Sequence, residues 1–174
     1  HYNSTLNPNP REKATFLTEN IQPLKAAGQL FFIDRQENEF NHNYEFVMAD
    51  GHTEKMLMLI LSVKGSKLLF AADTIPTSAH VHVPFVMSYD IHPLKTMEEK
   101  SNILNRVVHE DLVVVYDHDV NYEASKIVKT EKGYREIKSE FKNLKIFISP
   151  RVEIAIKRYI TLASKYMSDV NKPL

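Results

Sequence analysis

Three apolar segments of strand length, spread along the chain, each lead into a polar loop that carries a histidine or an aspartate. Residues 44–49 precede Gly51-His52-Thr53, residues 68–72 precede Asp73, and residues 112–116 precede Asp117-His118-Asp119. Imidazole and carboxylate groups are ligands that zinc accepts, and a carboxylate can bridge two metals. The pattern predicts that His52, Asp73 and His118 form part of one metal site.

Each of these residues alone also has an ordinary structural interpretation. A histidine in a turn is commonly solvated, an aspartate after a strand is commonly a turn or cap residue, and a polar strand end can carry charges by coincidence. An unpaired carboxylate at the end of a segment as apolar as residues 68–72 would be costly to bury. Three strand ends that each supply a metal ligand favour the metal interpretation over three separate coincidences.

Hydrophobic periodicity predicts a mixture of helices and strands along the chain. A first helix is expected to begin at Asn9-Pro10 and to stop at Gly28, after a loop over residues 1–9. A second helix is expected over 94–108, with Thr96 as its cap. Strands are predicted over 30–33, 44–49, 56–61, 68–72, 112–116 and 145–149, with a hairpin between 126 and 141 that turns at Gly133, and a closing helix over 150–167.

These elements indicate one α/β domain over residues 1–174. With 43% hydrophobic residues, the chain can bury one substantial core. Residues 56–61 are apolar on both faces, which indicates burial between layers. Sheets covered by helices, with the functional residues gathered at one rim, fit this order of elements.

Composition excludes several classes of partner and chemistry. Lys+Arg and Asp+Glu are both 22, so neither nucleic acid nor an anionic membrane is expected as a partner. No apolar run approaches the ~20 residues that span a bilayer. The absence of cysteine excludes disulfides and thiolate ligands. There is no Gly-x-Ser-x-Gly elbow for a serine nucleophile, and four scattered glycines cannot form a phosphate-binding loop.

The segment over 74–89 is long and lacks periodicity, as loops with a functional role often are. It contains His80-Val81-His82, and a pair of histidines with this spacing can chelate a metal. No acid or further histidine follows directly, so a self-contained metal motif is the weaker interpretation. We predict that this loop forms one wall of the same cleft and that His80 and His82 contact a substrate.

Taken together, the motifs resemble the metallo-β-lactamase-fold hydrolases. The resemblance rests on Gly51-His52-Thr53, on Phe70-Ala71-Ala72-Asp73 and on Tyr116-Asp117-His118-Asp119, in that order. It extends to Asn7-Pro8-Asn9-Pro10-Arg11 and to the segment from Asp73 to Asp90. Three features depart from the family. The upstream His-x-His-x-Asp-His motif is absent, Glu54-Lys55 replaces the usual Pro-Gly, and Ile75-Pro76 stands where lactonases of the family carry a tyrosine.

The resemblance implies an αββα sandwich, of which this chain looks like the later, C-terminal part. It implies two divalent metals, with zinc preferred and iron or manganese as alternatives. His52 would serve the first metal, Asp73 would bridge, and His118 would serve the second. The parent protein would then be a metal-dependent hydrolase of small molecules, acting on an ester, lactone, amide or phosphoester.

Two rival interpretations remain: a non-catalytic half-domain and a degenerate binding module. A half-domain would leave apolar sheet faces uncovered, so we expect self-association or binding to a complementary first half of the domain. We expect a cytoplasmic location.

Overall fold

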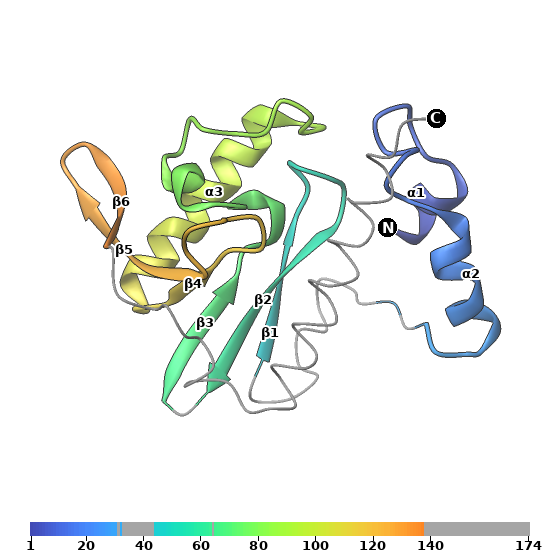
Figure 1. The fold of residues 1–174 in the computed structure, drawn as a ribbon, viewed down its shortest axis with the longest axis horizontal. Coiled ribbons are helices and arrows are strands. Elements are labelled where there is room, and N and C mark those ends of the chain that lie inside the picture. The colour runs from blue at the N-terminus through green and yellow to red at the C-terminus, as the bar shows by residue number, and fades with distance from the viewer. Residues whose placement is uncertain (31, 33–43, 64, 138–174) are drawn as a thin grey trace.

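A computed structural model describes residues 1–30, 32, 44–63 and 65–137, which form a mixed α/β structure (Figure 1). Its helices are α1 (Tyr2–Leu6), α2 (Thr18–Ala26) and α3 (Pro93–His109), with short 3-10 helices η1 (Ala72–Thr74) and η2 (Ser78–Val81). Its strands are β1 (Tyr44–Ala49), β2 (Met56–Val63), β3 (Ser66–Phe70), β4 (Val113–Val115), β5 (Ala124–Thr130) and β6 (Gly133–Ile137).

The six strands form one sheet in sequence order, and this order explains where the predicted site lies. β1 is antiparallel to β2 and β2 is antiparallel to β3, whereas β3 and β4 are parallel and are joined through α3. β1, β3 and β4 therefore run in the same direction. Their carboxyl ends meet at one edge of the sheet, which brings the three loops after them together.

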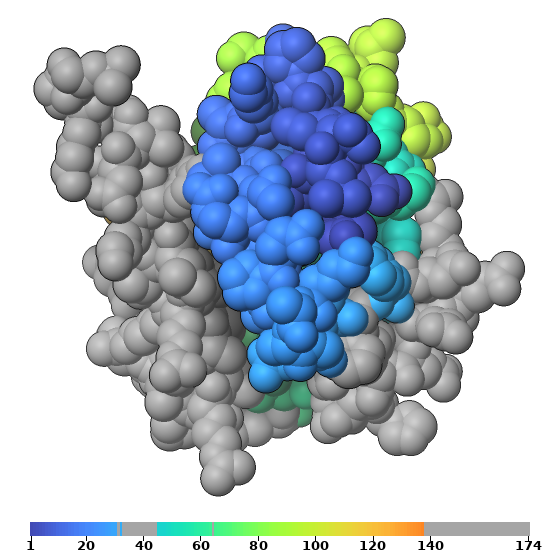
Figure 2. All heavy atoms as spheres, turned by 90° about the vertical axis from the view of Figure 1, so that its right-hand side faces the viewer, coloured from blue at the N-terminus to red at the C-terminus, as the bar shows by residue number. Residues whose placement is uncertain are grey.

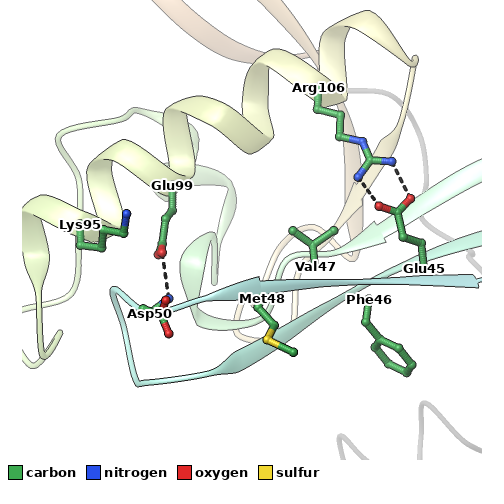
Figure 3. Close-up of a pocket in the computed structure, with 8 residues that line it drawn as sticks. All are labelled: Glu45, Phe46, Val47, Met48, Asp50, Lys95, Glu99 and Arg106. Atoms are coloured by element: carbon green, nitrogen blue, oxygen red, sulfur yellow. Dashed lines mark hydrogen bonds and ion pairs between the residues drawn. The ribbon is translucent and has the colours of Figure 1, made fainter. Parts of the chain in front are cut away.

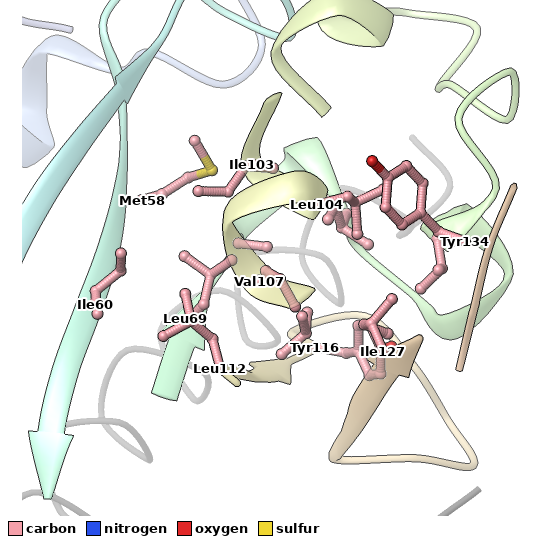
Figure 4. Packing of buried hydrophobic residues seen from close by; sticks show 14 of the residues in the cluster. Met58, Ile60, Leu69, Ile103, Leu104, Val107, Leu112, Tyr116, Ile127 and Tyr134 are labelled. Carbon is pink, nitrogen blue, oxygen red and sulfur yellow. The ribbon is translucent and has the colours of Figure 1, made fainter. Parts of the chain in front are cut away.

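Two apolar clusters lie on the two faces of this sheet. The larger one packs Ile103, Leu104 and Val107 of α3 against the sheet (Figure 4). The smaller one contains Leu68, Val113 and Val115. Successive side chains of a strand point to opposite faces, so β3 and β4 contribute to both clusters.

The predicted strands over 44–49 and 56–61 are confirmed, and β2 and β3 are joined by a turn at Gly65. The hairpin that turns at Gly133 is also confirmed, and β6 lies at the edge of the sheet. The prediction that residues 68–72 form a strand ending at Asp73 is wrong at its end. Ala72 has φ +46°, which breaks the extended backbone, so β3 ends at Phe70 and Asp73 lies in η1.

The predicted helix over 94–108 is confirmed, but Thr96 does not cap it. The helix begins one residue earlier at Pro93, with His92 at the N-cap position. Proline suits this first helical position because it has no N–H to leave unpaired. Thr96 instead lies in the first turn, where it is buried.

The N-terminal segment differs from its prediction in two respects. Residues 1–9 contain the short helix α1, which is too short for a hydrophobic period to reveal. No regular helix begins at Asn9-Pro10, although the Asn9 side-chain oxygen accepts the N–H groups of Arg11 and Glu12 as an N-cap residue does. Residues 10–15 form turns instead. α2 begins only at Thr18, and it ends before Gly28, whose φ is +67°. In Figure 2 this segment covers one side of the molecule.

The strand predicted over 145–149 and the helix over 150–167 lie outside the described residues, as do residues 31 and 33 of the strand predicted over 30–33. In the part of the chain that the structure describes, no helix is long and apolar enough to cross a membrane.

Lys100 is fully buried on α3, and it provides a test of the packing around the helix. Its ammonium group donates a hydrogen bond to the Phe85 carbonyl, and burial lowers the pKa of Lys100 to about 8 although Asp90 partly opposes the shift. Between pH 8 and 10.5 the unfolded lysine holds a proton that the folded one has lost, so stability should rise with pH there.

We expect the unfolding free energy to increase by about 2 kcal/mol between pH 7.5 and 9.5 from this group. Urea unfolding at the two pH values measures it. The same comparison in Lys100→Met isolates the lysine, and an equal slope in both proteins would contradict the assignment.

Candidate metal centre

His52 lies in the loop between β1 and β2 and is held from several sides. The backbone N–H groups of Ile91 and His92 donate to the carbonyls of His52 and Gly51, at 3.1 and 2.8 Å. Gly51 also packs against the first turn of α3, since a Cβ at this position would lie only 2.4–2.5 Å from atoms of Thr96. A glycine is therefore required immediately before the histidine.

The ring of His52 lies between two carboxylates. Its Nδ1 donates to Asp90 Oδ1 at 2.8 Å, and its Nε2 lies 3.3 Å from Asp73 Oδ2. Both carboxylates can only accept, so each ring nitrogen faces an acceptor; burial opposes protonation, but the hydrogen bonds to Asp73 and Asp90 outweigh it and raise the pKa of His52. With a cation on Nε2, the remaining ring proton would lie on Nδ1, facing Asp90. A carboxylate that fixes a histidine in this way is the usual outer partner of a metal-bound imidazole.

Asp73 is placed between two histidines. Its Oδ2 faces His52, and its Oδ1 lies 3.1 Å from His118 Nε2. One oxygen therefore faces each imidazole, which is the arrangement required of a carboxylate that bridges two cations. The structure brings all three sequence-predicted ligands together at one edge of the sheet.

A second aspartate joins this group. Asp73, Asp117 and His118 place ligand atoms within 4.8 Å of one another. Asp117 is buried more deeply than His118, and its Oδ1 has no hydrogen-bond partner among the described residues. The neighbouring Asp119 is used differently, because its carboxylate accepts the backbone N–H and the hydroxyl of Ser78, at 2.8 and 2.6 Å.

The electrostatics of the cluster reflect these distances. Burial opposes ionisation of Asp73, but hydrogen bonds to His118 and His52 outweigh it and hold the pKa of Asp73 well below its usual range. The hydrogen bond to Asp73 raises the pKa of His118. Burial, followed by the negative charge of Asp73, raises the pKa of Asp117.

These residues fit a divalent cation. The two imidazoles and the carboxylates are borderline and hard donors, which suit zinc, iron and manganese alike. A cation would also give the orphaned oxygen of Asp117 a partner and would relieve the repulsion between Asp117 and Asp73.

The two histidines of the 74–89 loop lie in other surroundings. His80 belongs to η2, and its Nδ1 lies 2.7 Å from the Thr77 hydroxyl. His82 Nδ1 lies 3.0 Å from an Arg135 guanidinium nitrogen, and its ring packs on Phe85. His82 also lines a cavity of about 280 Å³, together with Ser78, Ala79, Phe85, Tyr134, Arg135 and Glu136. Their roles as substrate contacts stay predictions.

The N-terminal segment reaches the same region through Arg11. Its guanidinium donates to the carbonyls of Asp90 and Ser88, at 2.6 and 3.2 Å. Tyr89 lies between these two residues, and its ring contacts that of His52 edge-on. Arg11 thereby fixes the backbone that carries the aspartate behind His52.

Sequence reasoning missed Asp90, Asp117 and Glu99. The carboxylate of Glu99 accepts two backbone N–H groups next to His52. Asp117 directly precedes His118, so its place at a strand end could have indicated it. Asp90 and Glu99 lie 38 and 48 residues from the groups that they contact, and no local pattern marks them.

Comparison with protein-family models and with curated protein sequences finds no match. Solved structures do match. A probable metal-dependent hydrolase from Staphylococcus aureus is 20% identical, with a TM-score of 0.64 over 79% of this chain and 50% of that one. The dizinc quorum-quenching lactonase AidC is 19% identical, with a TM-score of 0.58 over 82% of this chain and 53% of that one. Hydrolase AbOPH of the beta lactamase superfamily is 16% identical, with a TM-score of 0.62 over 82% and 54%.

The chain therefore has the fold of metal-dependent hydrolases of the beta-lactamase superfamily, as its motifs predicted. It spans about half the length of the structures that it matches. The described residues of this chain form one six-stranded sheet.

Proposed function

We propose that this chain supplies part of a dinuclear metal centre to a hydrolase of small molecules. The observation that carries the proposal is the position of Asp73, whose two oxygens each face a different imidazole Nε2 at 3.1 and 3.3 Å. The substrate would be an ester, lactone, amide or phosphoester, and zinc is the preferred metal.

Each residue has a defined part in this proposal. His52 and His118 would each hold one metal through Nε2, and Asp73 would serve both. Asp90 keeps the proton of His52 on Nδ1 and so leaves Nε2 free to coordinate. Asp117 offers a further buried oxygen. Metals bound there would lower the pKa of water toward ~7 and polarise the substrate.

The matched structures support a hydrolase class in general terms, since all three are described as hydrolases or lactonases. The loop with His80 and His82 would provide substrate contacts, and the cavity beside His82 offers room for part of a small molecule. A cytoplasmic location stays a prediction.

Metal binding by the 174-residue chain tests the proposal. We expect zinc to remain bound after dialysis, measured by elemental analysis, and titration calorimetry to give a lower affinity for His118→Ala by about tenfold or more. His109→Ala, at the exposed end of α3, is the matched histidine control and should bind as the wild type does. Equal binding by both variants would contradict the proposal.

A second candidate is a non-catalytic module that binds another chain. It is the rival interpretation that the sequence leaves open. The partner would be a second copy or a complementary chain. We expect sedimentation analysis of the purified chain to give a mass above that of one copy, 20.1 kDa. A monomer with cooperative unfolding would contradict this candidate.

A further inference from the structure

Glu99 makes a contact whose position suggests more than a surface role. It lies on α3 and reaches toward the end of β1 (Figure 3). One carboxylate oxygen accepts the backbone N–H of Asp50 and the other accepts that of Gly51, both at 2.9 Å. Hydrogen bonds to a charged acceptor are stronger than those between neutral groups. Glu99 also lines a cavity of about 370 Å³ beside β1, so its side chain is not shielded on every side.

The two N–H groups belong to the residues immediately before His52. The start of α3 contacts the same turn, because Gly51 packs on Thr96 and its carbonyl accepts the N–H of His92. Glu99 adds two further hydrogen bonds between this turn and α3. Together these contacts determine where the Cα of His52 lies.

The side chain of His52 then has few alternatives. It is only 9% exposed, and its two nitrogens are engaged by Asp90 and Asp73. A shift of the backbone would therefore move Nε2 relative to Asp73 rather than be absorbed by a new rotamer. Functional groups must be held within ~0.5 Å of their productive positions.

We propose that Glu99 is a positioning residue for His52: it acts through two backbone N–H groups to hold the imidazole at the candidate metal centre. This inference rests on the proposed metal-dependent function. Glu99 would act through the backbone and is not one of the candidate metal ligands. If the hydrogen bonds of Glu99 only stabilised the fold, their removal would lower the stability of the protein without changing its metal affinity. These two outcomes can be distinguished by measurement.

The test uses Glu99→Gln in the full chain. Glutamine has nearly the same shape, but its amide nitrogen cannot accept a hydrogen bond, so one of the two N–H groups loses its acceptor. We expect a 10–100-fold loss of zinc affinity, as seen for other residues that orient metal ligands. The matched control is Glu98→Gln on the same helix, where the exposed carboxylate lies 3.4 Å from Lys95. It should change zinc affinity less than twofold.

A second measurement keeps the inference independent of metal. In the metal-free chain, nitrogen NMR of the His52 imidazole should shift in Glu99→Gln and stay unchanged in Glu98→Gln. Glu99→Asp, which retains two acceptor oxygens on a shorter side chain, should give an intermediate shift and serves as a substitute if Glu99→Gln does not fold. Unchanged His52 signals in both Glu99 variants would overturn the inference, as would lower stability with unchanged zinc affinity.

The two proposals can fail separately. If the wild-type chain binds no zinc, the proposed function fails, and the His52 signals alone decide whether Glu99 positions the ring. If the wild type binds zinc and Glu99→Gln binds it equally well, only the positioning role fails.

Discussion

Replacing Asp73 with asparagine will lower zinc affinity by at least about 100-fold, the largest effect expected of any single substitution in the candidate centre. Asparagine keeps one acceptor oxygen and turns an NH₂ group toward the other imidazole. The NH₂ group has no lone pair available for a cation, so the metal position beside either His52 or His118 would lose this ligand. The change also removes the negative charge that, among the described residues, contacts both histidines.

Titration calorimetry with zinc measures the loss, and unfolding of the metal-free variant shows whether the fold survives. Asp111→Asn is the matched control, because Asp111 is exposed and pairs with Lys126 on the surface. It should bind zinc as the wild type does. Retention of wild-type affinity in Asp73→Asn would exclude Asp73 as a bridging ligand.

Gly51→Ala should destabilise the protein by about 3 kcal/mol. The added methyl group would lie 2.4 Å from the backbone nitrogen of Thr96 and 2.5 Å from its Cα. Both atoms belong to the first turn of α3 and cannot move aside as the end of a flexible side chain would. The loop or the helix must shift, and His52 would shift with them.

Urea unfolding measures the stability of Gly51→Ala and of Gly65→Ala. Comparing the two separates the cost of the steric contact with Thr96 from the cost of replacing a glycine by alanine. Gly65 has φ +82° and nothing within 4 Å of an added Cβ, so its substitution should cost only about 1–2 kcal/mol. Thr96→Ala should not rescue Gly51→Ala, because it removes the hydroxyl but neither backbone atom. Equal costs at the two glycines would show that the packing at Gly51 is less tight than described.

The sequence was sufficient to predict the three loops of the centre, because each follows an apolar strand. It could not show that β1, β3 and β4 run in the same direction, which depends on the pairing of the whole sheet. The resemblance to a known family supplied that arrangement. The pairing of the strands therefore brings His52, Asp73 and His118 together, and a local sequence pattern cannot predict that pairing.

Errors in the prediction arose where the backbone leaves regular structure without a local mark in the sequence. The Asn9 side chain accepts N–H groups as an N-cap residue does, yet only turns follow it. Ala72 adopts a positive φ, and an alanine in the sequence does not predict this conformation. Asp90 and Glu99 could not be found, because their importance lies entirely in contacts with residues distant in the chain.

The single parallel pair among the described strands has a consequence for folding. β1, β2 and β3 are joined by short connections, and so are β4, β5 and β6, so each set can form from local contacts. Pairing β3 with β4 must close the long loop through α3, which makes it the entropically costly step. Asp73 belongs to the first set and His118 to the second. Their contact therefore forms only once the two halves of the sheet have docked, and a cation held between them would stabilise that late, long-range step.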